Sequence, residues 1–196
     1  MPGSSPSTAA YRRSAAVSAY RTRFVDYIYL GNTGVSRTLP VREWRQGDTR
    51  FSGIEGEATF RAVFALPDGY SPFASGATDA LDRQYFRQQL DGDALPRTPM
   101  SRYGGDLGWE NGALRASVGA VRYLRQADVA KGEPVSDGFT LVDAHAAYRL
   151  GRGARYEVFA DVANLTNAEA RLHNSFLRLR APLPGRAVAL GFRATF

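Results

Sequence analysis

Apolar and polar residues alternate along the end of the chain, from Arg186 to Phe196. Because successive side chains of a β-strand point to opposite faces, this alternation predicts a strand with two different faces. The predicted apolar face holds Val188, Leu190, Phe192, Ala194 and Phe196, and the other face holds Ala189, Gly191, Arg193 and Thr195.

The same period of two continues through most of the chain and predicts eight long strands. They fall at residues 14–30, 43–66, 78–90, 99–110, 113–126, 138–150, 155–166 and 186–196. Two short turns, Glu110–Ala113 and Gly151–Ala154, carry glycine, as tight hairpins require. Longer connections are expected at Gly31–Arg42, Pro67–Thr78, Asp91–Thr98, Gln126–Asp137 and Asn167–Gly185.

These features favour an all-β fold, an antiparallel up-and-down transmembrane β-barrel of the bacterial outer-membrane kind. In such barrels an apolar face meets lipid, a polar face lines the lumen, and short periplasmic turns alternate with long extracellular loops. The short turns are therefore predicted to be periplasmic and the long connections extracellular, except for Pro67–Thr78, which should be a long periplasmic turn. No apolar run is long enough for a transmembrane helix.

Charge pairing predicts the register of the hairpin around Gly151. If paired residue numbers sum to 306, Arg149 lies opposite Glu157 and His145 lies opposite Asp161. A shift by two residues would instead place Arg149 opposite Arg155, which like-charge repulsion disfavours.

Composition excludes several functions. The chain has no cysteine and only two histidines, so disulfides and thiolate metal sites are excluded and no cofactor is expected. The net charge of +6 comes from arginines spread along the whole chain, without the local cluster that nucleic-acid binding requires. No catalytic constellation is visible, so the protein is not expected to be an enzyme.

Two further segments carry motifs. Val158–Asn167 ends in Asn164-Leu165-Thr166-Asn167, and Pro184-Gly185-Arg186 opens the last strand. Together with Asp48–Glu57 and Leu95–Pro99, they resemble the C-terminal part of the barrel of TonB-dependent outer-membrane receptors. The sequence of Ala170–Leu177 resembles that of the family branch associated with zinc or haem uptake.

The resemblance implies transport of an iron–siderophore, haem, zinc or similar nutrient across the outer membrane of a Gram-negative bacterium. It implies as partners the lipid bilayer, the barrel assembly machinery and a small-molecule or metal-complex substrate, with TonB acting only through a plug domain. Receptors of this kind have about 22 strands around a plugged lumen. Residues 14–196 are expected to be the C-terminal portion of such a barrel, without plug or signal peptide, and open or imperfectly closed. Residues 1–13 are expected to be disordered.

Three groups of candidate residues follow. Val188, Leu190, Phe192 and Phe196 resemble the signal by which the assembly machinery recognises its clients. Lumen-facing charges are expected at Glu55, Glu57, His145, Arg149, Glu157 and Asp161. No metal site is expected. The one residue considered as a metal ligand is His173, which lies on a predicted extracellular loop. Three acidic residues of the preceding long loop could approach it, namely Asp128, Glu133 and Asp137.

Two alternative architectures remain open at this point. Eight strands suffice for a small closed barrel, which would serve adhesion or anchoring. A soluble β-sandwich binding module also shows alternation and turns.

Overall fold

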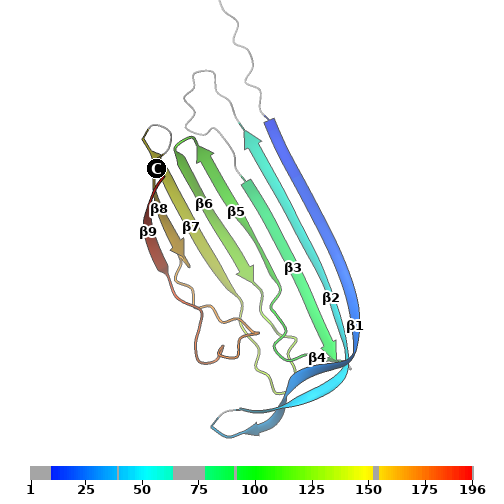
Figure 1. Cartoon of the computed structure of the whole chain (residues 1–196). Coiled ribbons are helices and arrows are strands. Elements are labelled where there is room, and N and C mark those ends of the chain that lie inside the picture. Colours follow the sequence, from blue (N-terminus) through cyan, green and yellow to red (C-terminus); the bar gives the residue numbers. More distant parts are fainter. Residues whose placement is uncertain (1–9, 39, 64–77, 91, 152–154, 196) are drawn as a thin grey trace, which may run out of the picture.

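The computed structural model describes residues 10–38, 40–63, 78–90, 92–151 and 155–195, which form one antiparallel sheet (Figure 1). Its neighbouring strands follow the order β1-β2-β3-β5-β6-β7-β8-β9, and the short β4 pairs with β3. The strands are β1 (Ala10–Ser36), β2 (Pro40–Val63), β3 (Thr78–Leu90), β4 (Asp93–Ala94), β5 (Arg102–Asn111), β6 (Leu114–Tyr123), β7 (Phe139–Leu150), β8 (Tyr156–Ala163) and β9 (Ala187–Ala194). No helix in the described part of the chain is long and apolar enough to cross a membrane.

The eight predicted strands are confirmed, and 78–90 has the predicted bounds. Two expectations are wrong. β1 already begins at Ala10, so residues 10–13 belong to the sheet, while residues 1–9 lie outside the described residues. The loop expected at Gly31–Arg42 is mostly strand, because Gly31 pairs with Glu43 and Asn32 with Arg42.

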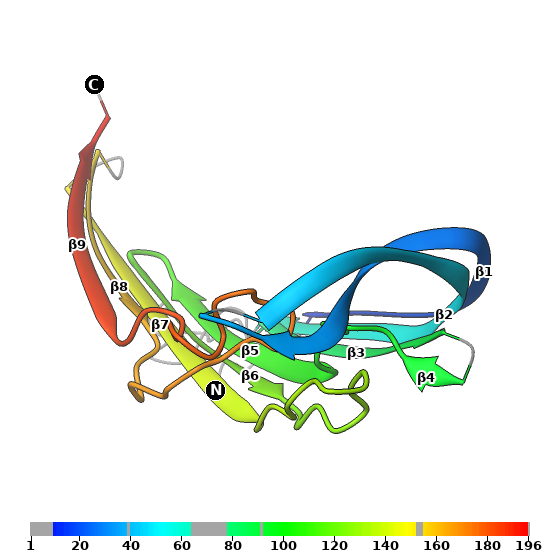
Figure 2. The same cartoon turned by 90° about the horizontal axis from the view of Figure 1, so that it is seen from below.

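The first hairpin, β1–β2, keeps pairing beyond the point where β3 ends. β2 pairs with β3 only from Thr49 onward, so residues 25–48 project past the rest of the sheet. A register shift between Phe24 and Tyr27 accompanies a left-handed backbone at Asp26 (φ 57°). Such an irregularity bends a strand and increases its twist, and Figure 2 shows this hairpin curling over the sheet.

The sheet is curved and open. Figure 2 shows it as a trough, with β9 at one edge and β1 at the other. β1 and β9 do not pair with each other in the described residues, so the closed eight-stranded barrel is not observed, and neither is the second layer of a sandwich. The prediction of an open all-β sheet is confirmed.

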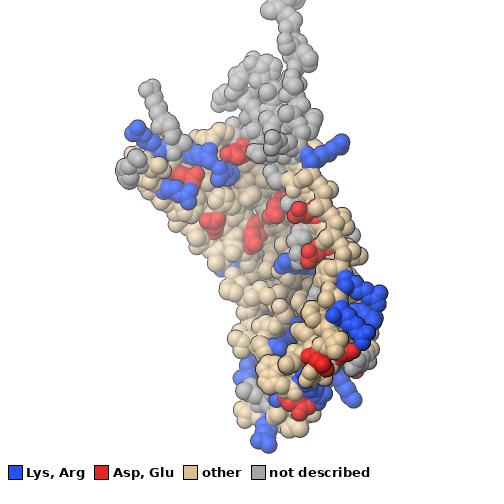
Figure 3. All heavy atoms as spheres, turned by 45° about the vertical axis from the view of Figure 1, so that its right-hand side comes forward, with Lys and Arg blue, Asp and Glu red and all other residues tan. Residues whose placement is uncertain are grey.

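The two faces of the sheet differ as the sequence predicts. The apolar face exposes large side chains, with exposed fractions of 79% at Val17, 80% at Leu190 and 62% at Phe192. The opposite face carries the charges, and Figure 3 shows acidic side chains gathered over the middle of the strands with basic ones toward the ends. Since soluble sheets rarely expose such a continuous apolar face, this face is expected to contact lipid or another protein.

The long connections gather at one end of the strands. The β1–β2 tip and the loops 92–101, 124–138 and 164–186 all lie there, whereas the β5–β6 turn and Gly151 lie at the opposite end (Figure 1). The predicted segregation of short turns and long loops is confirmed for these connections; residues 67–77 lie outside the described residues. A small core forms beneath the loops from Met100, Phe139 and Ala170.

Candidate functional site

A buried polar cluster joins the loops 124–138 and 164–186. His173 is fully buried, and its Nδ1 lies 2.5 Å from Arg178 Nη1 and 2.9 Å from Ser136 Oγ. Arg178 also donates to the Pro134 carbonyl at 3.0 Å, and its Nη2 lies 3.4 Å from Glu133 Oε1. A guanidinium can only donate, so Nδ1 of His173 must accept, and the ring proton is therefore assigned to Nε2.

Glu133 occupies the centre of this cluster. Its carboxylate accepts the backbone N–H of Arg97 at 3.1 and 3.2 Å, and its Oε2 lies 3.5 Å from His173 Nε2. Burial alone raises the pKa of Glu133, but the His173 ring, the Arg97 N–H and the charge of Arg178 outweigh burial and lower it. Burial lowers the pKa of Arg178, while the charge of Glu133 opposes that effect. The cluster thus joins three loops through the ionised pair of Glu133 and Arg178, while Nε2 of His173 lies 3.5 Å from the Glu133 carboxylate without a hydrogen bond.

The structure places His173, the one residue that the sequence offered as a ligand, inside this cluster. The residue is buried, not displayed on the loop surface, and its Nδ1 lone pair is taken by Arg178 and Ser136. Glu133 does approach it, as the sequence suggested, but as part of an ion cluster. Among the described residues, no group of three or more histidine, aspartate or glutamate side chains has the arrangement of a metal site.

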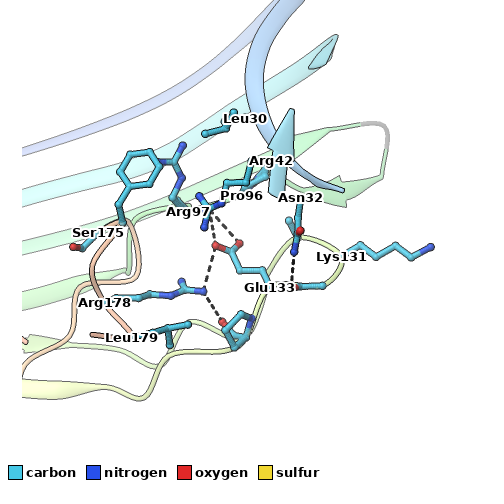
Figure 4. Close-up of a pocket in the computed structure, with 14 residues that line it drawn as sticks. Leu30, Asn32, Arg42, Pro96, Arg97, Lys131, Glu133, Ser175, Arg178 and Leu179 are labelled. Atoms are coloured by element: carbon cyan, nitrogen blue, oxygen red, sulfur yellow. Dashed lines mark hydrogen bonds and ion pairs between the residues drawn. The ribbon is translucent and has the colours of Figure 1, made fainter. Parts of the chain in front are cut away.

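A pocket opens beside this cluster, at the loop end of the sheet (Figure 4). Its volume is about 90 Å³, which is smaller than most sites for drug-sized molecules, so only a small ligand or part of a larger one fits inside it. The pocket draws residues from the β1–β2 hairpin and from all three loops, including Arg42, Arg97, Glu133, Phe176 and Arg178. The hairpin is tied to the loop 124–138 by Asn32, whose Nδ2 donates to the Gly132 carbonyl at 3.1 Å.

Two arginines of the pocket contact the same aromatic ring. The Arg97 guanidinium carbon lies 3.7 Å from the centroid of the Phe176 ring, and that of Arg42 lies 5.4 Å from it. Both distances are within the range of cation–π attraction. Burial, followed by the charge of Arg42, lowers the pKa of Arg97, and the charge of Glu133 partly opposes these two effects.

Comparison with known families agrees with the architecture. The family described as "TonB dependent receptor-like, beta-barrel" matches residues 9–165, which is more than half of the chain. The chain belongs to the TonB-dependent receptor β-barrel family. Proteins of this family are receptors and transporters of the outer membrane of Gram-negative bacteria.

The fold is also that of a solved transporter structure. A chain titled "Copper transporter OprC" matches with a TM-score of 0.73 at 21% sequence identity, covering 94% of this chain and 29% of that chain. The ferric-catecholate import receptor Fiu from K12 E. coli matches with a TM-score of 0.47 at 13% identity, covering 94% of this chain and 33% of that one. This chain thus spans about a third of these receptors. A search of the curated proteins finds no match.

The family motif before the last strand forms a clasp between the two ends of the loop 164–186. The Asn164 side chain is buried; its Nδ2 donates to the Ala168 and Pro184 carbonyls at 2.9 and 3.3 Å. The side-chain oxygen Oδ1 of Asn167 accepts the backbone N–H of Arg186 at 2.9 Å. Both asparagines have left-handed backbones (φ 49° and 54°), which asparagine tolerates better than most residues.

Gly185 is required at this clasp by close approach. A Cβ at this position would lie 2.8 Å from the Asn167 side-chain oxygen. Leu165, the remaining motif residue, donates its N–H to the Val142 carbonyl at 2.7 Å and leaves its side chain partly exposed. The motif thus closes the loop on its own strands.

The predicted register of β7 and β8 is confirmed, because His145 pairs with Asp161 and Arg149 with Glu157. His145 Nδ1 lies 2.6 Å from Asp161 Oδ1. The other charges form a row of ion pairs across β5 to β9 on the polar face, from Glu110 through Arg149 and Glu157 to Arg193, with separations of 3.8, 3.5 and 3.2 Å. Glu55 and Glu57 lie on the same face of β2 and are exposed.

The residues predicted as an assembly signal lie on the free edge strand β9. Val188, Leu190 and Phe192 expose 63, 80 and 62% of their surface on the apolar face. Phe196 lies outside the described residues.

Sequence reasoning missed the pocket. Arg42, Arg97, Phe176 and Arg178 come from segments up to 136 positions apart along the chain, as their residue numbers show. Their residue types form no recognisable spacing, so only the folding of the loops over one another brings them together.

Proposed function

We propose that this chain forms part of the barrel wall and of the extracellular binding surface of a receptor that takes up a scarce nutrient in a TonB-dependent way. The match of the receptor barrel family to residues 9–165 carries the proposal. The exposed apolar face suits lipid, and the charged opposite face suits a hydrated lumen. The proposed nutrient is an iron–siderophore, haem, zinc or similar complex.

In this proposal, the loop end of the sheet is extracellular and the short turns are periplasmic. The pocket then faces incoming nutrient, and the buried Glu133–His173–Arg178 cluster holds two of its walls in place. TonB acts through a plug domain, and β9 presents its edge and its apolar residues to the barrel assembly machinery by strand addition.

The test is nutrient uptake by cells that carry or lack the gene of the full receptor. Cells carrying it should accumulate the labelled nutrient, and loss of TonB should abolish the accumulation without changing the amount of receptor in the outer membrane. Growth on a panel of iron, haem and zinc sources at limiting concentration would identify the nutrient. Accumulation that is equal with and without the receptor, or that persists without TonB, would contradict the proposal.

A further inference from the structure

The pocket at the loop end has more positive charge than its own carboxylate neutralises. Arg42, Arg97, Lys131 and Arg178 line it, together with one acidic residue, Glu133. The oxygens of Glu133 are already engaged by the Arg97 backbone N–H, by Arg178 and by His173. Glu133 therefore neutralises only one of the four positive charges around the pocket, although its charge also acts on Arg97.

Two of these guanidinium groups have no carboxylate partner in the described part of the chain. Neither Arg42 nor Arg97 takes part in an ion pair there, although they approach the same Phe176 ring and Arg42 helps to lower the pKa of Arg97. In addition, Nε of Arg97 is buried without a hydrogen-bond partner among those residues. A buried donor without a partner is unfavourable, and the Phe176 ring attracts the charge of the guanidinium group without accepting a hydrogen bond from Nε.

The walls around these guanidinium groups are largely apolar. Leu30, Pro96, Phe176 and Leu179 line the same pocket. Figure 4 shows Lys131 pointing away from it. An inorganic ion would leave these apolar walls uncovered, whereas an organic anion would cover them and also meet the arginines.

We propose that this pocket binds a small organic anion whose carboxylates are held by the guanidinium groups of Arg42 and Arg97. Arginine matches a carboxylate with two parallel N–H donors, and such charge-assisted bonds are about twice as strong as neutral ones. The inference rests on the proposed uptake function and deepens it: the nutrient, or the chelator that carries it, presents carboxylates at the extracellular face.

The test is calorimetric titration of the full receptor, purified in detergent, with phthalate as probe. Phthalate is a planar dicarboxylate, and its uncharged dimethyl ester is the matched control ligand. Phthalate should bind, more weakly as salt rises, and the diester should not. Absence of phthalate binding, or equal binding of the diester, would overturn the proposal.

Variants locate the site. Arg42→Gln and Arg97→Gln should each weaken phthalate binding by about tenfold to a hundredfold, the value of one charge-assisted hydrogen bond. Arg97→Lys keeps the charge and should recover part of the affinity, which separates loss of charge from loss of folding. Lys131→Gln, which removes a lining charge that points away, should change binding by less than about twofold. Unchanged binding in both glutamine variants would refute the assignment.

A competition experiment separates the two proposals. Excess phthalate should inhibit nutrient uptake through the unmodified receptor and not through Arg97→Gln. If phthalate does not bind while uptake remains TonB-dependent, the anion site is wrong and the receptor function stands. If phthalate binds the purified protein while no TonB-dependent uptake exists, the receptor function is wrong and the site stands.

Discussion

Glu133 is the residue on which the packing of the three loops depends most. Its carboxylate contacts the backbone of the loop 92–101 and two side chains of the loop 164–186. A buried ion cluster gives little net stability when complete, but removing one member leaves the other charges unpaired. The cluster therefore acts mainly to specify how the loops meet.

Glu133→Gln should loosen these loops without unfolding the sheet. The neutral amide leaves the Arg178 charge uncompensated, at a cost of about 3–5 kcal/mol for a buried pair. Hydrogen exchange should become faster in 124–138 and 164–186 and stay unchanged in β6 and β7. Asp128→Asn, on an exposed residue of the same loop, is the control and should change nothing. Equal exchange in both variants would contradict the role of Glu133.

Acid should have the same effect on the unmodified protein. The pKa of Glu133 is lower in the folded protein than its ordinary value of 4.5, so its ionisation stabilises the loops above that value. This stability is lost as the pH falls below 4.5 and through the lowered pKa. Loop hydrogen exchange, corrected for its intrinsic pH dependence, should therefore rise in this window. In Glu133→Gln the corrected exchange should be flat over the same window; an equal rise there would assign the effect to another group.

At the scale of the element, the alternation of apolar and polar residues predicted the number and the approximate positions of the eight long strands. Charge pairing also fixed the β7–β8 register, because a shift by two residues opposes like charges. The strand ends at the β1–β2 hairpin were not predictable, because Gly31 and Asn32 are turn-forming residues by type yet pair with Glu43 and Arg42 across the hairpin. The Asn164–Asn167 motif was recognised by resemblance, and only the structure shows it to be a loop clasp.

Substitution by arginine should destabilise the receptor strongly at one residue of β9 and only weakly at the residue next to it. Leu190 lies on the apolar face with 80% of its surface exposed, whereas Ala189 lies on the polar face opposite Asp161. Leu190→Arg should destabilise the full receptor in a bilayer by up to about 2–4 kcal/mol, the cost of a lipid-facing arginine at midplane. Ala189→Arg should cost far less, since it gains an acidic neighbour.

The measurement is refolding into lipid vesicles at increasing denaturant, followed by heat-modifiable migration in gel electrophoresis. The midpoint should shift for Leu190→Arg and remain near that of the unmodified protein for Ala189→Arg. Equal shifts would mean that the apolar face of β9 does not meet lipid.

At the scale of the whole molecule, the sequence predicted a curved sheet with two distinct faces and segregated loops. It could not predict the pocket, because that site depends on how far the β1–β2 hairpin bends over the loops. The bend accompanies a left-handed backbone at Asp26, and an aspartate inside an alternating pattern adopts that conformation only occasionally. The surroundings of His173 were not predictable for the same reason, because its partners Ser136 and Arg178 meet only when two loops pack together.

The orientation of the molecule in the membrane has a direct test by single-cysteine labelling, because this chain contributes no cysteine of its own and the unmodified receptor measures any background. Lys131 lies on the loop end and Arg155 beside the short turn at the other end, and both are exposed. In intact cells that express the full receptor, a membrane-impermeant maleimide should label Lys131→Cys. It should label Arg155→Cys only after the outer membrane is permeabilised, since the β7–β8 turn is then accessible from the periplasm. Labelling in the reverse order would place the pocket on the periplasmic side, where it could not receive a nutrient from outside the cell.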